Sequence, residues 1–185
     1  MKKLMIVVLG CAVASGALAA GFQLSLTPDI AIQDRDTEIN GVSIGVWNEN
    51  PGPQFHWQFG FVNGATGDSK GVQWFVFLPT IYNYAENFTG LQWGWVNNTS
   101  NDFVGWQNGL VNLTFGKFVG FQSAAFNYAG TMTGFQLGVV NYAKSANNCL
   151  QVGIVNIIED NAWFSDFPND LAQGMVIVNW SFGGE

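Results

Sequence analysis

Residues 134–141, Gly134-Phe135-Gln136-Leu137-Gly138-Val139-Val140-Asn141, form the best copy of a phrase that decides the fold. The phrase is an apolar residue, Gln, a variable residue, a small residue, two apolar residues and Asn. Its Gln position falls at Ser43, Gln58, Gln73, Gln92, Gln107, Gln122, Gln136 and Gln151, so the steps are 15, 15, 19, 15, 15, 14 and 15 residues. A period this short predicts one strand-and-turn unit copied along an axis, in which each copy packs on its neighbours.

Three positions of the phrase are apolar in all eight copies: the residue before Gln, the residue three after Gln and the residue before Asn. Because these positions lie on both sides of an extended strand, we expect the strand to be covered on both faces and these positions to be buried. The residue two after Gln is small in seven of the eight copies. That pattern indicates close approach of another backbone or of a packed side chain.

Matching Gln and Asn positions would form hydrogen-bonded ladders if the copies stacked in register. The predicted fold is therefore an all-β repeat protein with a period of about 15 residues, a β-solenoid with an atypical C-terminal cap. Eight coils would give a rod about 40 Å long. The alternative is an antiparallel β-barrel or meander, although membrane barrels use strands of about 9–11 residues and unequal loops at their two ends.

The N-terminal residues 1–19 have the features of a secretory signal peptide: Met1-Lys2-Lys3, an apolar stretch from Leu4 to Leu9, and small residues ending at Ala19. The alternative is a lipoprotein box at Val8-Leu9-Gly10-Cys11, in which Cys11 would be lipidated. Either interpretation predicts export to the bacterial periplasm, outer membrane or cell surface. We expect an entry strand and loop at residues 20–40, the repeat domain at 41–158 and the C-terminal cap at 159–185.

Charge excludes one large class of partner. Without residues 1–19, four basic side chains stand against 13 acidic ones, a net charge of about −9. Such a surface repels nucleic acid and anionic lipid headgroups. Charged residues make up only 10% of the chain and aromatic residues 15%, which fits an all-β body and not a disordered chain.

Candidate catalytic residues are few. His56 is the only histidine, which excludes a two-His metal site, and Cys149 is the only cysteine after the leader, which excludes a disulfide framework. The acidic pairs Asp34/Asp36 and Glu159/Asp160 fit no calcium-loop pattern and are interpreted as solvated turns. We therefore predict no metal, no cofactor and no enzymatic activity.

One aromatic stripe is a candidate binding site. Trp57, Trp74, Trp93 and Trp106 fall at or beside the same position of four consecutive copies. The functional hypothesis is a row of rings that stacks on glycans, and the alternative is ordinary packing within or between sheets.

Four stretches, Gly90 to Asn97, Gly105 to Asn112, Gly134 to Asn141 and Leu150 to Asn156, resemble the repeat of the bacterial surface repeat-containing, lipoprotein-like proteins. The resemblance spans roughly residues 41–182 and implies an exported, envelope-associated protein, with no catalytic residues to transfer. The expected function is a structural or interaction module that contacts envelope components or other proteins. The alternatives are a small outer-membrane β-barrel and a carbohydrate-binding module, and membrane association would use the lipid anchor or the barrel.

Overall fold

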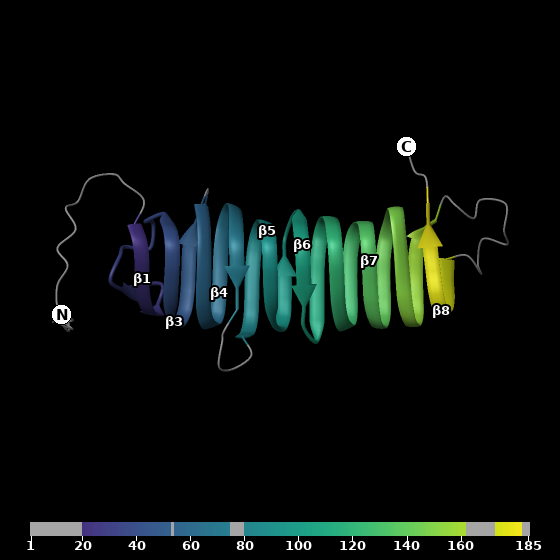
Figure 1. Cartoon of the computed structure of the whole chain (residues 1–185), viewed down its shortest axis with the longest axis horizontal. Helices are drawn as coiled ribbons and strands as arrows, with labels where there is room; N and C mark the ends of the chain where they lie inside the picture. Colours follow the sequence, from purple (N-terminus) through teal and green to yellow (C-terminus); the bar gives the residue numbers. More distant parts are fainter. Residues whose placement is uncertain (1–19, 53, 75–79, 162–172, 183–185) are drawn as a thin grey trace.

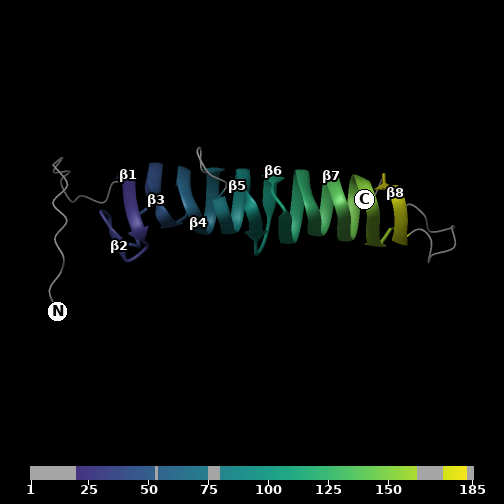
Figure 2. The same ribbon diagram turned by 90° about the horizontal axis from the view of Figure 1, so that it is seen from below.

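The computed structural model describes residues 20–52, 54–74, 80–161 and 173–182. It is built from eight strands: β1 (Ala20–Thr27), β2 (Ile30–Ala31), β3 (Ile39–Pro51), β4 (Gln54–Gln73), β5 (Thr80–Thr99), β6 (Phe103–Asn108), β7 (Val111–Asp160) and β8 (Gly174–Ser181). The long strands wind round the axis as successive coils, which stack into a rod from β1 at one end to β8 at the other (Figure 1). Figure 2, turned by 90°, shows thinner coils, so the solenoid is flattened.

Parallel pairing confirms the β-solenoid. Strands β3, β4, β5, β6 and β7 pair in parallel, and their register places Ser43 opposite Gln58, Gln73 opposite Gln92, and Gln92 opposite Gln107. Equivalent residues of successive copies therefore lie directly above one another. An antiparallel barrel or meander would pair neighbouring copies in opposite directions, so that alternative is wrong.

The predicted amide ladders are present and fully buried. Each Gln from Gln73 to Gln151 donates its Nε2 hydrogen bond to the Oε1 of the preceding Gln, at 2.7–2.8 Å. The Asn ladder from Asn48 to Asn156 runs with the opposite polarity, since each Nδ2 donates to the Oδ1 of the next coil, at 2.7–3.1 Å. Because the two ladders point in opposite directions, their amide dipoles oppose each other along the rod.

The largest apolar side chains inside the coil form one column beside the ladders. Phe88 stacks on Phe103 with ring centroids 5.8 Å apart, and Phe103 stacks on Phe118 at 5.4 Å. Met132 continues the column, and alanines, Cys149 and Ile158 complete the interior cluster. The interior is therefore narrow, and most of its width is taken by hydrogen-bonded amides.

The small position of the phrase is explained by this narrow interior. A Cβ placed on Gly138 would lie 2.1 Å from the Ala124 carbonyl oxygen and 2.8 Å from Nδ2 of Asn127. The predicted close approach of backbone and side chain is confirmed.

The prediction for the apolar positions is wrong. Among the described residues three after Gln, all but the half-buried Phe61 are exposed, with Trp95 at 50%, Leu110 at 56% and Ile154 at 66%. The coil turns its Gln and Asn positions inward, where ladder bonds satisfy them, and this leaves the apolar positions outside. Periodicity separates the two faces of a strand, but it does not say which face is inside when a polar face can saturate its own hydrogen bonds.

Both ends of the rod break the parallel pattern. At the N-terminal end β2 pairs antiparallel with β1, and at the C-terminal end β8 pairs antiparallel with β7, placing Asn179 opposite Gln151. The atypical C-terminal segment therefore covers the last coil with a strand of reversed direction. Such reversed strands interrupt the template that a parallel stack offers to another chain.

Candidate functional site

The four predicted tryptophans lie on the outer surface of the strand that carries Gln. Trp57, Trp93 and Trp106 are 47%, 39% and 41% exposed, and Trp74 is half-buried. Trp93 contacts both Trp74, with ring centroids 5.7 Å apart, and Trp106, at 5.9 Å. Trp57 contacts Phe59 of its own coil at 6.2 Å. The structure thus brings three of the four together as a row of rings along the rod.

Two phenylalanines extend this row. Trp106 contacts Phe121 at 5.8 Å, and Phe121 stacks on Phe135 at 5.4 Å with an interplanar angle of 10°. The Trp pattern missed both residues. The repeat pattern could have indicated both phenylalanines, because each occupies the always-apolar position before Gln.

Ring orientation affects what the row can bind. Trp74 and Trp93 are 22° from coplanar, so each covers a face of the other. Glycan recognition by an aromatic side chain normally uses an open ring face, whereas a stacked pair offers its edges to solvent. The glycan hypothesis stays a prediction, with little support from this arrangement.

A broader apolar surface surrounds the row. Four outward positions form this surface from coil to coil: the residues immediately before, three after and four after Gln are apolar in every copy, and the residue immediately after Gln is apolar in six of eight, with Asn108 and Ser123 as the exceptions. We call this surface the apolar strip. Its most exposed members are Leu26, Val46, Trp57, Trp95, Leu110, Val139 and Ile154. The strip runs along the Gln strand and round the adjoining corner of the coil.

Charged side chains lie elsewhere on the described part of the chain. At the opposite corner of the coil, Asn87 donates Nδ2 to Asp68 at 2.9 Å, and the Lys117 backbone N–H donates to Asp102 at 2.8 Å. Asp102 also donates its own backbone N–H to Asn87 at 3.1 Å. These carboxylates accept local hydrogen bonds and serve the turns of successive coils. The rod therefore has an apolar side and a polar corner.

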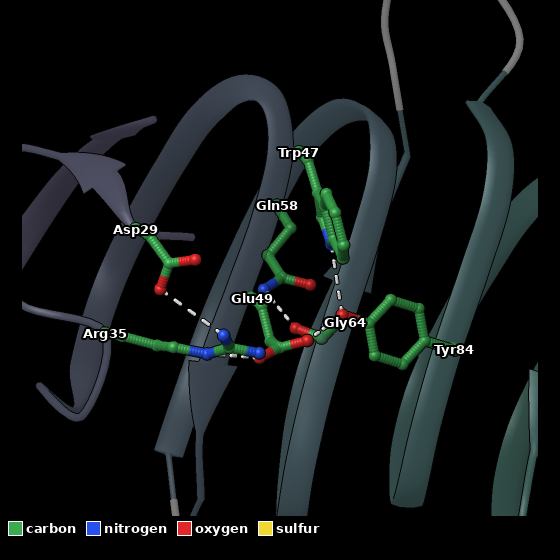
Figure 3. Close-up of polar contacts among 7 residues, drawn as sticks. All are labelled: Asp29, Arg35, Trp47, Glu49, Gln58, Gly64 and Tyr84. Atoms are coloured by element: carbon green, nitrogen blue, oxygen red, sulfur yellow. Dashed lines mark hydrogen bonds and ion pairs between the residues drawn. The ribbon is translucent and has the colours of Figure 1, made fainter. Parts of the chain in front are cut away.

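A second charged cluster fastens the N-terminal segment to the coils (Figure 3). Arg35 donates to Glu49 through Nε at 2.9 Å and contacts Asp29 at 3.4 Å, while Trp47 donates to the Tyr84 hydroxyl at 3.1 Å. The Tyr84 hydroxyl in turn donates to Glu49. Burial and this carboxylate raise the pKa of Tyr84.

Tyr84 reaches Glu49 across a glycine. A Cβ on Gly64 would lie 2.1 Å from the Tyr84 ring, so only glycine leaves room for the ring at this position. The cluster is thus built from three consecutive coils, and two carboxylates compensate the charge of Arg35, whose side chain is 48% exposed.

The only histidine of the chain and the cysteine of its described part, Cys149, are inside the rod. His56 is fully buried against Phe88, with ring centroids 6.1 Å apart, and burial lowers its pKa to about 4. Neither ring nitrogen has a hydrogen-bond partner among the described residues. Cys149 is also fully buried, and burial raises the pKa of its thiol to about 12. Neither side chain meets solvent or any substrate.

The predicted acidic pairs do not converge. Asp34, Asp36, Glu159 and Asp160 are all exposed, and Glu159 accepts a hydrogen bond from the Tyr142 hydroxyl. No group of three or more His, Cys, Asp or Glu side chains within the described ranges is placed to hold a metal ion. Cys11 and the rest of residues 1–19 lie outside the described residues. Among the described residues, no helix has the length and apolar character to cross a membrane.

Comparison with known proteins adds no further constraint: no protein-family model, curated protein or solved structure matches this chain.

Proposed function

We propose that this chain is an exported, envelope-associated structural or interaction protein without enzymatic activity, and that the apolar strip is its binding surface. One observation carries the proposal. The strip is uninterrupted by charge over the described coils, although its side chains are 36–66% exposed at many positions. Contiguous exposed apolar patches of more than a few hundred Å² mark interaction sites in soluble proteins.

The interior supports a non-enzymatic role. The histidine and the described cysteine are sealed inside the rod, and the carboxylates at the polar corner are engaged by turns. General acid-base or nucleophilic catalysis requires such groups to reach a bound substrate. The surface offers binding area instead.

Export rests on the sequence. Residues 1–19 have the pattern of a signal peptide, and the acidic remainder disfavours nucleic acid as a partner. The relation to surface repeat-containing, lipoprotein-like proteins and the choice between cleavage after Ala19 and lipidation of Cys11 remain predictions. An outer-membrane barrel receives no support from parallel coils.

Site-specific photo-crosslinking in a bacterial host tests the proposal. A benzophenone amino acid at Leu110, inside the strip, should give crosslinked products in the envelope fraction. The same probe at Phe115, which is equally exposed at 54% but lies outside the strip, should give far fewer. Recovery of the chain in the cytoplasm, or equal crosslinking from both positions, would contradict the proposal. Mass spectrometry of the mature N-terminus separates Ala20 from lipidated Cys11.

A further inference from the structure

We propose that the partner of the apolar strip is a second copy of this chain, docked through the outer face of the Gln strand. This inference rests on the proposed function of the strip as a binding surface. It goes further by naming the occupant and the part of the strip that forms the centre of the interface.

The available area matches what a stable dimer needs. The Asn ladder joins eight coils, so the face is about 35 Å long at the usual spacing between strands. From the residue three before Gln to the residue three after it, the face is about 20 Å wide. Each copy would therefore bury about 700 Å², and the pair about 1,400 Å², within the range of specific interfaces.

The centre of this face has the composition of an interface core. Trp57, Trp93 and Trp106 lie in the two middle rows and are 39–47% exposed. Tryptophan is enriched among residues that dominate binding energy, and a charge-free centre with a polar margin is the usual arrangement. The margin three before Gln mixes polar residues, which include Lys70, Thr89 and Thr133, with the exposed apolar residues Phe55 and Val104.

Charge placement removes the main objection to self-association. Without residues 1–19 each copy carries a net charge of about −9, and two such copies repel one another if their charges meet. On the described residues these charges lie at the polar corner and in the N-terminal cluster, away from the middle rows of the face. The uncharged middle rows can therefore meet those of a second copy without opposing like charges, and Lys70 in the marginal row is the only charged side chain of this face among the described residues.

The ends of the rod direct association to the side. The antiparallel strands β2 and β8 interrupt the parallel stack at both ends, which discourages end-to-end growth. A flat sheet face with identical rows can instead pack on its own copy about 10 Å away, as the two sheets of a sandwich do. A two-fold axis makes such a contact self-complementary and closed.

A lipid surface is less favoured as the occupant. Peripheral membrane surfaces usually combine apolar side chains with Lys or Arg that face anionic headgroups. Here Lys70 is the only basic side chain in the marginal row of the face, Arg35 is held by Asp29 and Glu49, and Lys117 lies at the polar corner. A bilayer is therefore an outcome of the test and not part of the proposal.

Sedimentation velocity of the purified full chain after export, from about 1 µM to about 100 µM, tests the inference. We expect a dimer for the natural chain. Leu137→Glu places one carboxylate per copy in a middle row and should weaken the dimer at least about a hundredfold. Phe115→Glu introduces the same carboxylate at a similarly exposed position outside the face and should leave the dimer unchanged. Leu137→Met should also remain dimeric, and circular dichroism should show all three variants folded.

Tryptophan emission gives an independent readout. Dilution of the natural chain through the concentration range of dissociation should shift the emission to longer wavelength, because Trp57, Trp93 and Trp106 become exposed to water. The Leu137→Glu variant should emit at the longer wavelength at every concentration. A natural chain that is monomeric at every concentration overturns the inference, as does equal weakening by Leu137→Glu and Phe115→Glu. A monomer that floats with phosphatidylcholine vesicles overturns the dimer but leaves the strip as a binding surface. Loss of all strip-specific crosslinking at Leu110 would overturn the proposed function as well.

Discussion

Gln107 and Leu110 belong to the same coil and lie three residues apart, yet Gln107 is fully buried and Leu110 is 56% exposed. On hydropathy alone their places would be exchanged. Gln107 donates to Gln92 at 2.8 Å and accepts from Gln122 at 2.8 Å, so both polar atoms of its amide are satisfied inside the rod. Burial of an amide is costly only when its hydrogen bonds are lost, and the ladder replaces them at every step.

The exposed row of residues three after Gln has a different source of stability. Leu110 and its neighbours along the rod lie a single strand spacing apart, so each apolar side chain covers part of the next. The ring contacts from Trp74 to Phe135 show the same effect in the adjoining rows. The inside of this rod is specified by hydrogen bonds, whereas the outside is specified by stacking and remains available to a partner.

The largest expected effect on the interior comes from a single added methyl group. Gly105 has φ of 134°, and a Cβ at this position would lie 2.0 Å from the carbonyl oxygen of Gly90. Gly105→Ala should therefore cost more than about 5 kcal/mol in the free energy of unfolding, or prevent folding. Chemical denaturation measures the change.

Gly174→Ala is the matched control, because no atom lies within 4 Å of the Cβ that it would introduce. A similar loss of stability in both variants would mean that the general effect of replacing glycine by alanine in a strand, and not close stacking of the coils, sets the cost.

Breaking the Gln ladder should have the next largest effect. Gln107→Leu keeps the approximate volume but removes the Gln107 donor to the Gln92 carbonyl, which keeps only the Thr99 hydroxyl at 3.4 Å. It also removes the acceptor used by Gln122 and by the Thr114 hydroxyl at 3.1 Å. With two or more buried groups left unpaired, the expected cost is about 4 kcal/mol. Asn108 immediately follows Gln107 and belongs to an outward position. Asn108→Leu should therefore change the free energy of unfolding by less than about 0.5 kcal/mol. If both variants were equally stable, the polar interior would contribute nothing specific.

Much of the fold was predictable from the sequence because stacking in register places like residues together. The period predicted coils, the Gln and Asn positions predicted ladders, and the small position predicted close approach, as Gly138 confirms. The sequence pattern did not show which side of the strand faces inward, because apolar residues occur on both sides of it. Only the width of the coil decides it, and a narrow interior accommodates stacked amides more readily than rows of Trp and Val.

The candidate surface was predictable in part. Trp57, Trp74, Trp93 and Trp106 lie on the outside, but their grouping as a Trp stripe omitted Phe121 and Phe135. It also omitted the aliphatic corner at Leu110 and Ile154, because those residues were expected to be buried. The N-terminal cluster of Arg35, Glu49 and Tyr84 joins residues up to 49 positions apart and leaves no local sequence signal.

A pH experiment tests the contribution of the buried His56 separately from that of the outer surface. The pKa of His56 is lowered from 6.5 to about 4, so the unfolded chain binds a proton between these values and the folded chain does not. Stability should therefore fall as pH drops from about 6.5 to about 4, by roughly 3 kcal/mol.

His56→Phe keeps a ring beside Phe88 and should abolish that part of the pH dependence. Denaturation midpoints of both proteins at pH 7 and pH 4 give the comparison. An unchanged pH profile in the variant would mean that His56 is reached by solvent in the folded chain.

The N-terminal cluster should respond more weakly because it is partly exposed. Tyr84→Phe removes the hydroxyl that donates to Glu49 and accepts from Trp47, with an expected cost of about 1 kcal/mol. Tyr142→Phe, at an exposed hydroxyl near the other end of the rod, should cost less. Hydrogen exchange should show faster opening of β1 and β3 in the first variant only, since Arg35 then loses part of its anchoring. Equal protection of these strands in both variants would contradict a fastening role.

The smallest effect on stability is expected where the rod is most apolar. Ile154 is 66% exposed, so Ile154→Ser removes little buried area and should change the free energy of unfolding by less than about 0.5 kcal/mol. The same change reduces the apolar area that the strip offers to a partner. A denaturation curve that overlays the natural chain, together with weaker strip-dependent crosslinking at Leu110, would place this residue in binding and not in folding. A large loss of stability would instead mean that the outer corner holds the coils together, and the contrast between a hydrogen-bonded interior and an available outer surface would fail.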